Sequence, residues 1–444
     1  MAVAVIGNGA LGLFTALELV KQQKTVYLIG PRNVDGSASY AAGLMIALFS
    51  EIDCIDFDSP LFKLKMNSYD FIIELWDRVS KNGSTPGFEQ YQGSLGTEIV
   101  EHPKGATCFE KESFGKLKKI VFEKKNISNA RLSSSGGIIL PKEKPIDARK
   151  LLGHLVKELE SRVTFVPTKA TKIIEVSDSK IEIQLEKCNP LRVDKAILCC
   201  GAFSSGIVRK SYFTDKVNIN AFYGVGTGGL ITSEHKHIRL PELIGIKRTV
   251  NRGGECGHHF VPCDSSIYFG ASNFFSKYPV KEVQASSLLE LLRGVEAFWG
   301  ADVIQKLSVK TLTGFRSITD DAIPMIGPID EKVFLLYGTA RDGFTWAPFY
   351  SKLAANWSAG KLDKNNEWID LCSPTRQKRS FLSRDVSLDM YIRNRIAAAE
   401  QHSIQFISEA ELKSRFLESH KNVPADFTIH PSLVNYFYHE YTHI

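Results

Sequence analysis

The feature that most constrains this chain lies at its start, where a short apolar run leads directly into a G-x-G-x-x-G sequence. Residues 3–6 predict a buried parallel strand, and apolar residues at helical spacing over 11–20 predict a helix that begins inside the glycine triplet. Gly7 then permits the tight turn, Gly9 lets a pyrophosphate approach the backbone, and Gly12 lets the helix pack close to the strand. The N–H groups and the dipole of the helix N-terminus favour a bound anion. The segment therefore predicts a dinucleotide-binding start to the fold.

The second strand, at residues 25–29, lacks the acidic residue that usually follows it in such folds. That Asp or Glu holds the ribose hydroxyls of the adenosine. Here the strand is followed by Gly30, Pro31 and Arg32. The missing carboxylate weakens a nicotinamide interpretation and leaves open which group holds the ribose of any dinucleotide.

Composition and charge narrow the class of protein. With 444 residues, of which 43% are hydrophobic and 23% charged, the chain has the profile of a soluble globular protein of two or three domains. The formal net charge of +6 is modest and the basic residues are scattered, so a nucleic-acid partner is not indicated. No apolar run approaches the length of a membrane span, and the early first strand leaves no room for a signal peptide. The eight cysteines form no C-x-x-C pair, so we expect a reducing, cytoplasmic environment.

Elements of a nucleotide-binding fold recur at the start, middle and end of the first 361 residues, which predicts a substrate domain inserted between them. The expected elements are helices at 62–79, 150–159, 286–299 and 346–358, strands at 163–167, 195–200 and 333–337, a hairpin-like pair over 172–185 and an antiparallel sheet over 217–271. We assign nucleotide-binding segments to 1–80, 141–210 and 311–361, substrate-domain segments to 81–140 and 211–310, and a C-terminal extension to 362–444. The expected class is α/β, with an α+β substrate domain.

Four stretches in a fixed order carry a family resemblance. They are GSASYAAGLM at 36–45, ILCCGAFS at 197–204, GFRSITDDAIPMIGP at 314–328 and GTARDGFTWAP at 338–348. The third is the most specific, since it is similar to the signature G-x-R-P-x-T-x-D-x-x-P-x-I-G. Over residues 2–361 the chain resembles the glycine oxidase and D-amino-acid oxidase (DAO) family of FAD-dependent oxidoreductases. The resemblance implies a Rossmann-like FAD-binding domain with an inserted antiparallel-sheet domain.

The resemblance also implies a reaction. The substrate is a small amine or amino acid. A hydride passes from the carbon next to its amine to flavin N5, and water hydrolyses the resulting imine. The reduced flavin then passes its electrons to molecular oxygen, which gives peroxide. The cofactor carries the chemistry while the protein supplies orientation and charge, so no dedicated acid–base residue is required. Because no Cys or His matches a position of covalent attachment, we expect noncovalent FAD.

Candidate site residues follow from the same matches. Arg316 is expected to bind the substrate carboxylate, because a planar guanidinium suits a bidentate contact. His259 takes the place of a pocket Tyr in the family pattern Y-x-V-P-R-x-D-G, with a purely structural histidine as the alternative. This difference weakens glycine and sarcosine as substrates. Arg341 either adds positive charge beside the flavin N1/O2 edge or caps its loop. The residues expected at the cofactor are Gly7, Gly9, Ala10, Leu11, Gly12, Ser37, Ser39, Ala42, Gly43, Leu44, Ala170, Gly201, Arg341, Asp342, Gly343, Phe344 and Thr345.

Beyond residue 361 the resemblance stops, and helices are expected at 388–399 and 409–417. The sequence from His439 to His443 matches the H-E-x-x-H pattern of zinc proteases. Only Ile444 follows, so a downstream third ligand is missing and we expect no metal. The preferred interpretation is a helix that covers a domain face or a dimer contact, or that forms a lid over the pocket.

Three other functions remain open at this stage. An FAD-dependent 2-hydroxy-acid dehydrogenase would use the same arginine for its carboxylate. An oxidase could act on an amine of a larger molecule, such as a tRNA base or a biosynthetic intermediate. A flavin-binding protein without turnover is the alternative outside enzymes. The sequence leaves the substrate, the electron acceptor and the oligomeric state open, including a homo-oligomer.

Overall fold

The computed structural model of the chain describes residues 1–43, 97–100, 137–140, 148–177, 179–219, 223–232, 243, 246–249, 257–263, 266–321, 323–363, 367–376, 382–402, 408–423, 428, 431 and 434. The helix expected at 62–79 and the H-E-x-x-H sequence at 439–443 lie outside the described residues.

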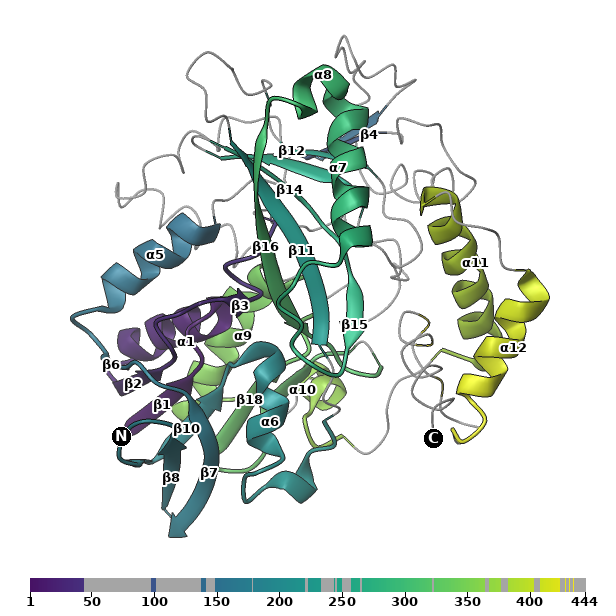
Figure 1. Cartoon of the computed structure of the whole chain (residues 1–444). Coiled ribbons are helices and arrows are strands. Elements are labelled where there is room, and N and C mark those ends of the chain that lie inside the picture. Colours follow the sequence, from purple (N-terminus) through teal and green to yellow (C-terminus); the bar gives the residue numbers. More distant parts are fainter. Residues whose placement is uncertain are drawn as a thin grey trace.

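One sheet contains the nucleotide-binding elements and is parallel except at one edge. Its strand order is β17-β18-β10-β1-β2-β6, and only β17 runs antiparallel, to β18, among these strands. The strands are β1 (Ala2–Ile6), β2 (Thr25–Ile29), β6 (Thr164–Val166), β10 (Lys195–Leu198), β17 (Met325–Pro328) and β18 (Val333–Tyr337). Strands from the start, middle and end of the chain therefore lie side by side (Figure 1).

The two faces of this sheet are covered by different elements, because alternate residues of a strand point to opposite sides. In β1, Val3 and Val5 join an apolar cluster with α1, α5 and α9, whereas Ala4 and Ile6 join another with β7, β8, β9 and α6. Figure 1 shows α1 and α9 on one side of these strands and β7 and β8 on the other. The covering elements are α1 (Ala10–Lys21), α5 (Ala148–Leu159), α9 (Gly343–Ser358), β7 (Ala170–Ser177), β8 (Lys180–Leu185), β9 (Leu191–Val193) and α6 (Ser204–Val208).

A second, larger sheet has the order β3-β16-β11-β14-β13-β12-β4-β5, with β15 also paired to β11. Its pairs are antiparallel except β3 with β16 and β12 with β4. The strands are β3 (Gly36–Ser37), β4 (Thr97–Val100), β5 (Gly137–Leu140), β11 (Tyr223–Thr232), β12 (Ile246–Thr249), β13 (His259–Pro262), β14 (Ile267–Gly270), β15 (Phe274–Ser276) and β16 (Ser308–Ser317). Since β3 follows β2 closely, the chain passes from the first sheet to the edge of the second within a few residues.

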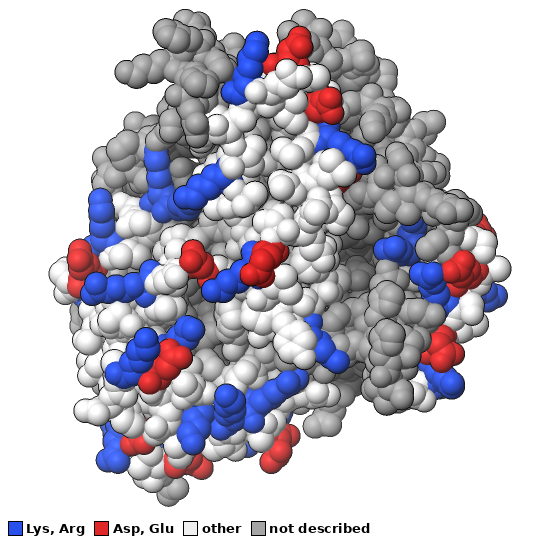
Figure 2. All heavy atoms as spheres, in the orientation of Figure 1, with Lys and Arg blue, Asp and Glu red and all other residues white. Residues whose placement is uncertain are grey.

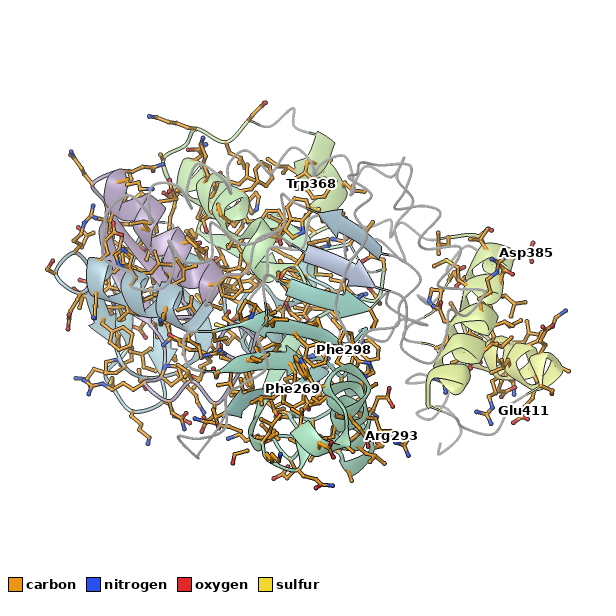
Figure 3. The ribbon with its side chains drawn as sticks, turned by 90° about the horizontal axis from the view of Figure 1, so that it is seen from above. Phe269, Arg293, Phe298, Trp368, Asp385 and Glu411 are labelled. Atoms are coloured by element: carbon orange, nitrogen blue, oxygen red, sulfur yellow. The ribbon has the colours of Figure 1, made fainter. Side chains whose placement is uncertain are left out.

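Helix α7 (Ala285–Trp299) covers part of the second sheet. Its Phe298 packs with Phe269 and Phe260 in one cluster, and the rings of Phe260 and Phe298 lie 4.5 Å apart. Figure 3 shows Phe269 and Phe298 close together, while Arg293 of the same helix points outward. The short helix α8 (Ala301–Ile304) then leads into β16.

The C-terminal extension contributes three helices among the described residues: α10 (Glu367–Cys372), α11 (Arg384–His402) and α12 (Glu409–Ser419). Trp368 of α10 is buried in the core and stacks on Trp346 of α9, with ring centroids 5.9 Å apart. Helices α11 and α12 pack on each other and lie to one side of the molecule (Figures 1 and 3).

The expected α/β class with a parallel sheet and a further antiparallel sheet is confirmed. Most helix and strand ends lie within a few residues of the prediction, and two of the differences have a clear local cause. Strand β10 ends at Leu198 rather than residue 200, because Cys199 and Cys200 turn into the 3-10 helix η1 (Gly201–Phe203). Helix α9 begins at Gly343 rather than 346, because its first turn consists of Gly, Phe and Thr, which have weak helix propensity and conceal its start.

The charges on the face shown in Figure 2 are mixed. Lys and Arg are scattered over it together with fewer Asp and Glu, and several basic side chains gather near its lower edge. This distribution agrees with the small formal charge of +6. No helix in the described stretches is both long enough and apolar enough to cross a membrane.

Candidate functional site

A cavity of about 700 Å³ lies where the carboxyl ends of β1 and β2 meet the second sheet. The first sheet contributes the glycine turn after β1, and the second contributes parts of β11, β13, β14 and β16. Segments 33–43 and 339–345 also line it. In a doubly wound fold, ligands bind beyond the carboxyl ends of the strands, so this cavity is the candidate site.

The three glycines of the opening turn are required for different reasons. Gly7 has a φ of +116°, and a Cβ there would overlap the Cys199 carbonyl; a Cβ at Gly12 would overlap the Gly7 carbonyl. A Cβ at Gly9 would meet only side-chain atoms, and the nearest of them is Ser39 Oγ at 3.0 Å. Packing within the fold therefore explains Gly7 and Gly12, whereas Gly9 keeps space open toward the cavity.

Two helix N-termini lie at this cavity. The start of α1 has no side-chain cap from Gly9 and no acidic residue in its first turn, and its Ala10 N–H donates to Ser39 Oγ at 3.0 Å. Gly343, Phe344 and Thr345 place the start of α9 at another part of the wall. Both ends direct backbone N–H groups and a positive partial charge toward the cavity. This arrangement fits an anionic dinucleotide such as FAD.

The cavity wall offers a further polar group before β7. Thr168 is buried and lines the wall, and its Oγ1 has no hydrogen-bond partner among the residues that the structure describes. A buried hydroxyl without a partner costs free energy, so it fits a site that a ligand completes. The expected residue Ala170 lies in the same segment of the wall.

Where the ribose carboxylate is missing, the space beside Gly30 is filled by another side chain. A Cβ at Gly30 would lie within 2.5 Å of Asn8 Oδ1, and the Asn8 amide donates to the Pro31 carbonyl at 2.8 Å. The Asn8 side chain thus occupies the space that a larger residue 30 would need. Asn33 and Asp35, slightly further along, line the cavity instead.

Arg316 lies in the wall of the cavity on β16 and is held by neutral groups. Its Nη1 donates to Asn273 Oδ1 at 2.5 Å and its Nη2 to the Ser272 carbonyl at 2.8 Å. Ser272 is itself fixed to Thr227 of β11 by two hydrogen bonds, of 2.9 and 3.1 Å. Within the described part of the chain, Arg316 has no further hydrogen bond and no ion pair with a carboxylate. Its charge is therefore available to an anionic ligand.

His259 and Tyr268 form another part of the wall. The two side chains belong to the paired strands β13 and β14, and their rings stack with centroids 5.7 Å apart. His259 Nδ1 lies 3.3 Å from the Gly257 carbonyl, and Tyr268 OH donates to the Ala41 carbonyl at 3.2 Å. A Cβ at Gly43 would lie 2.5 Å from His259 Nε2. The ring pair thus lies directly against the segment that the resemblance places beside the flavin.

The adjacent residues Cys199 and Cys200 also line the cavity, and both thiols are buried. Cys200 Sγ donates to the Ile6 carbonyl at 3.0 Å, and burial raises the pKa of this thiol to about 12. Burial also raises the pKa of Cys199 well above its ordinary value. Both thiols are protonated near neutral pH and are therefore poor nucleophiles.

The cavity brings together most of the residues singled out from the sequence. Gly12 and Asp342 are not part of its lining, and Leu44 lies outside the described residues. Several groups at or beside the cavity were not predicted from the sequence. Asn8 occupies a variable position of the glycine motif, and the others lie outside the matched stretches: Asn33, Asp35, Thr168, Tyr268, Ser272 and Asn273. The expected residues that line the cavity are Gly7, Gly9, Ala10, Leu11, Ser37, Ser39, Ala42, Gly43, Ala170, Gly201, His259, Arg316, Arg341, Gly343, Phe344 and Thr345.

Comparisons with known proteins agree on the family and the fold. A model of the DAO family, described as FAD dependent oxidoreductase, matches residues 2–357. The chain is similar in structure to glycine oxidase from Geobacillus kaustophilus, with a TM-score of 0.69 and 18% sequence identity over 85% of this chain and 98% of that one. It is also similar to iminodiacetate oxidase from Chelativorans sp. BNC1 (TM-score 0.68, 17% identity, 84% and 98% covered). For L-proline dehydrogenase from P. horikoshii the TM-score is 0.65 at 16% identity, with 86% and 98% covered. A comparison with curated proteins found no significant match.

Proposed function

The chain belongs to the DAO family of FAD-dependent oxidoreductases, and we propose that it oxidises the C–N bond of a small amine or amino acid that carries a carboxylate. The main support for this proposal is the environment of the Arg316 guanidinium. Ser272 and Asn273 hold it at the cavity, and it has no carboxylate partner among the described residues. A guanidinium in this state binds a carboxylate more favourably than one whose charge is already neutralised. The proteins named above with similar folds act on amino acids or amino-carboxylates, which supports the same substrate class.

The glycine turn and the two helix N-termini are the groups that would hold FAD. Gly9 leaves space for the pyrophosphate, Ser39 orders the first turn of α1, and Thr168 and Ala170 line another part of the cavity. Asn33 and Asp35 are the groups available for ribose hydroxyls, in place of the residue that Asn8 excludes. When bound, FAD supplies the two-electron acceptor for the oxidation.

Substrate orientation is the task of the second sheet. The Arg316 guanidinium binds the carboxylate and thereby fixes which hydrogen of the neighbouring carbon faces the cofactor. His259 and Tyr268 form the adjoining wall and restrict the volume available to the substrate side chain. The start of α9 and Arg341 place positive charge at the cavity, where negative charge develops during the reaction.

We propose that the cofactor is bound noncovalently, and the cysteines of the cavity wall support this. Cys199 and Cys200 are the cysteines in the described wall, and burial keeps both thiols protonated. A covalent bond to the isoalloxazine ring would require a nucleophile, which these thiols do not supply. We propose molecular oxygen as the electron acceptor, in line with the oxidases among the similar structures.

The experiment measures anaerobic reduction of the purified holoprotein by candidate substrates. Reduction is monitored as the loss of visible flavin absorbance. Matched pairs are used: alanine with ethylamine, proline with pyrrolidine, and both enantiomers of each amino acid. The proposal predicts bleaching by at least one amino acid and much slower bleaching by its carboxylate-free partner. Bleaching by lactate alone would instead indicate a 2-hydroxy-acid dehydrogenase, and no bleaching by any of these compounds would refute the proposed substrate class. Peroxide formed on admitting air distinguishes an oxidase from a dehydrogenase.

A further inference from the structure

An arginine of the C-terminal extension reaches back into the core of the molecule. Arg376, at the end of the turn that follows α10, pairs with Asp321, and the two side chains are 6% and 0% exposed. The Nη2 of Arg376 lies 2.9 Å from each oxygen of that carboxylate, and its Nε donates at 3.2 Å. The remaining donors reach the carbonyls of Ile323, Pro324, Cys372 and Ser373. A buried guanidinium with every donor engaged fixes its partner in both distance and angle.

Asp321 belongs to the loop that follows β16, and the end of β16 is bound to the segment that leads into α9. The Ser317 carbonyl accepts from the Ala340 N–H at 2.9 Å, and Ser317 Oγ accepts from the Gly338 N–H at 3.1 Å. A Cβ at Gly338 would lie 2.6 Å from the Thr319 methyl group. Arg376 therefore anchors a loop that starts beside Arg316, the candidate substrate arginine. Through Thr319 this loop also packs against Gly338, in the segment that leads into α9.

A second contact from the extension is apolar. Helices α11 and α12 and Val434 form a buried cluster against which Phe275 and Ile318 pack. Phe275 lies on β15, two residues after Asn273, which binds the Arg316 guanidinium. Ile318 lies two residues after Arg316 and would contact any side chain at Gly224. The extension thus packs on the segments that carry Arg316 and its amide partner.

We propose that the C-terminal extension is a positioning element of the substrate site, and that Arg376 and Ile318 are the positioning residues through which it acts on Arg316. The family model ends at residue 357, so this contribution lies beyond the region that the family match covers. The proposal rests on the proposed function, in which Arg316 binds the substrate carboxylate. An extension bound in this way orders the guanidinium before the substrate arrives, which reduces the entropy lost on binding.

The test compares Arg376→Lys, Ile318→Ala and Arg316→Ala in the full-length holoprotein. Arg393→Ala is the matched control, since Arg393 forms an exposed ion pair with Asp389 on α11, far along the chain from the loop. Acetate, a carboxylate without an amine, is titrated against the visible absorbance of the bound flavin. KM and kcat are then measured for an amino acid and for its carboxylate-free amine. Ile318→Ala leaves the ion pair between Arg376 and Asp321 intact. It therefore tests the role of the extension even if Arg376→Lys does not fold.

We expect Arg376→Lys and Ile318→Ala to weaken acetate binding and to raise KM for the amino acid by up to about 100-fold, since a displacement of about 1 Å can cost that much. The carboxylate-free amine and the Arg393→Ala variant should change little. If both variants bind acetate like the parent while Arg316→Ala does not, the role of the extension is refuted and the proposed function stands, even if their thermal stability falls. If Arg316→Ala itself binds acetate like the parent, both the proposed function and this inference are refuted.

Discussion

The Arg316 guanidinium lies directly over Gly226, so closely that a Cβ at residue 226 would overlap Nη2. The two residues are diagonal neighbours on one face of the sheet, since Gly226 pairs with Gly314 and Arg316 pairs with Gly224. The glycines of β11 thus form a shallow surface along which the long side chain extends toward Ser272 and Asn273. The position of the Arg316 charge in the cavity therefore depends on the absence of a side chain at residue 226.

Gly226→Ala should therefore displace the guanidinium without unfolding the sheet. We expect KM for a carboxylated substrate to rise by up to about 100-fold, since a shift of about 1 Å can cost that much. Amines without a carboxylate should be oxidised at the parental rate, because they do not use the arginine. Gly153→Ala is the control, since nothing lies within 4 Å of a Cβ at that helical position. Equal KM values for Gly226→Ala and the parent would show that the guanidinium does not need this space.

Asn273→Asp should compete with the substrate for Arg316. The new carboxylate would lie at the position where the amide oxygen now accepts from Nη1 at 2.5 Å, and it would neutralise the guanidinium. We expect weaker binding of acetate and a higher KM for amino acids, with the affinity for FAD unchanged. Titration of the flavin absorbance with acetate measures the effect. Tighter acetate binding in this variant would contradict the assigned role of Arg316.

Gly9→Val should prevent FAD binding, because the side chain would fill the space that the turn leaves beside the start of α1. The parent protein should be yellow and should release FAD into the supernatant on acid precipitation, as expected for a noncovalent cofactor. Absorbance spectra of the variant and of the supernatant check both statements. Flavin that remains with the pellet would refute noncovalent binding, and a yellow Gly9→Val protein would place the pyrophosphate elsewhere.

The extension should lose stability as the pH falls. His420 is buried beside Phe416, its Nδ1 lies 2.8 Å from the Phe416 carbonyl, and burial lowers its pKa below the ordinary value of about 6.5. The nearby Arg384 lowers this pKa further. Below pH 6.5 the unfolded chain therefore binds more protons than the folded one, so stability decreases from that pH downward through the lowered pKa.

Hydrogen exchange of α12 measured between pH 7.5 and pH 5, corrected for intrinsic rates, tests this expectation. Protection should decrease with pH in the parent and should depend less on pH in His420→Gln. Equal pH dependence in the two proteins would show that another group is responsible.

Much of the first sheet could be predicted because its signals are local. The glycine triplet identifies the turn after β1, and the uninterrupted apolar run at 333–337 matches β18 residue for residue. The helix expected at 150–159 matches α5, in which Leu151, Leu155 and Leu159 are all buried. Arg316 and His259 could be placed because they lie in or beside family motifs, and both line the cavity.

The groups that complete the site could not be predicted, because they depend on pairings between distant segments. Tyr268 stacks on His259 only through the register of β13 and β14. Asn273 reaches Arg316 from a segment 43 residues earlier in the sequence, and Arg376 reaches Asp321 across 55 residues. No periodicity or spacing in a single sequence reports such contacts.

The most direct test of the account is the reduction of bound flavin in Arg316→Ala. Removing the guanidinium leaves a substrate carboxylate without its partner in the cavity, a loss on the order of 2–5 kcal/mol for a buried charge pair. We expect the variant to keep its FAD and to bleach slowly, if at all, with the best carboxylated substrate, while an amine without a carboxylate bleaches at the parental rate. Arg316→Lys should restore the rate only in part, because an ammonium keeps the charge but loses the planar pair of donors. Flavin reduction in Arg316→Ala as fast as in the parent, with that same carboxylated substrate, would contradict the account.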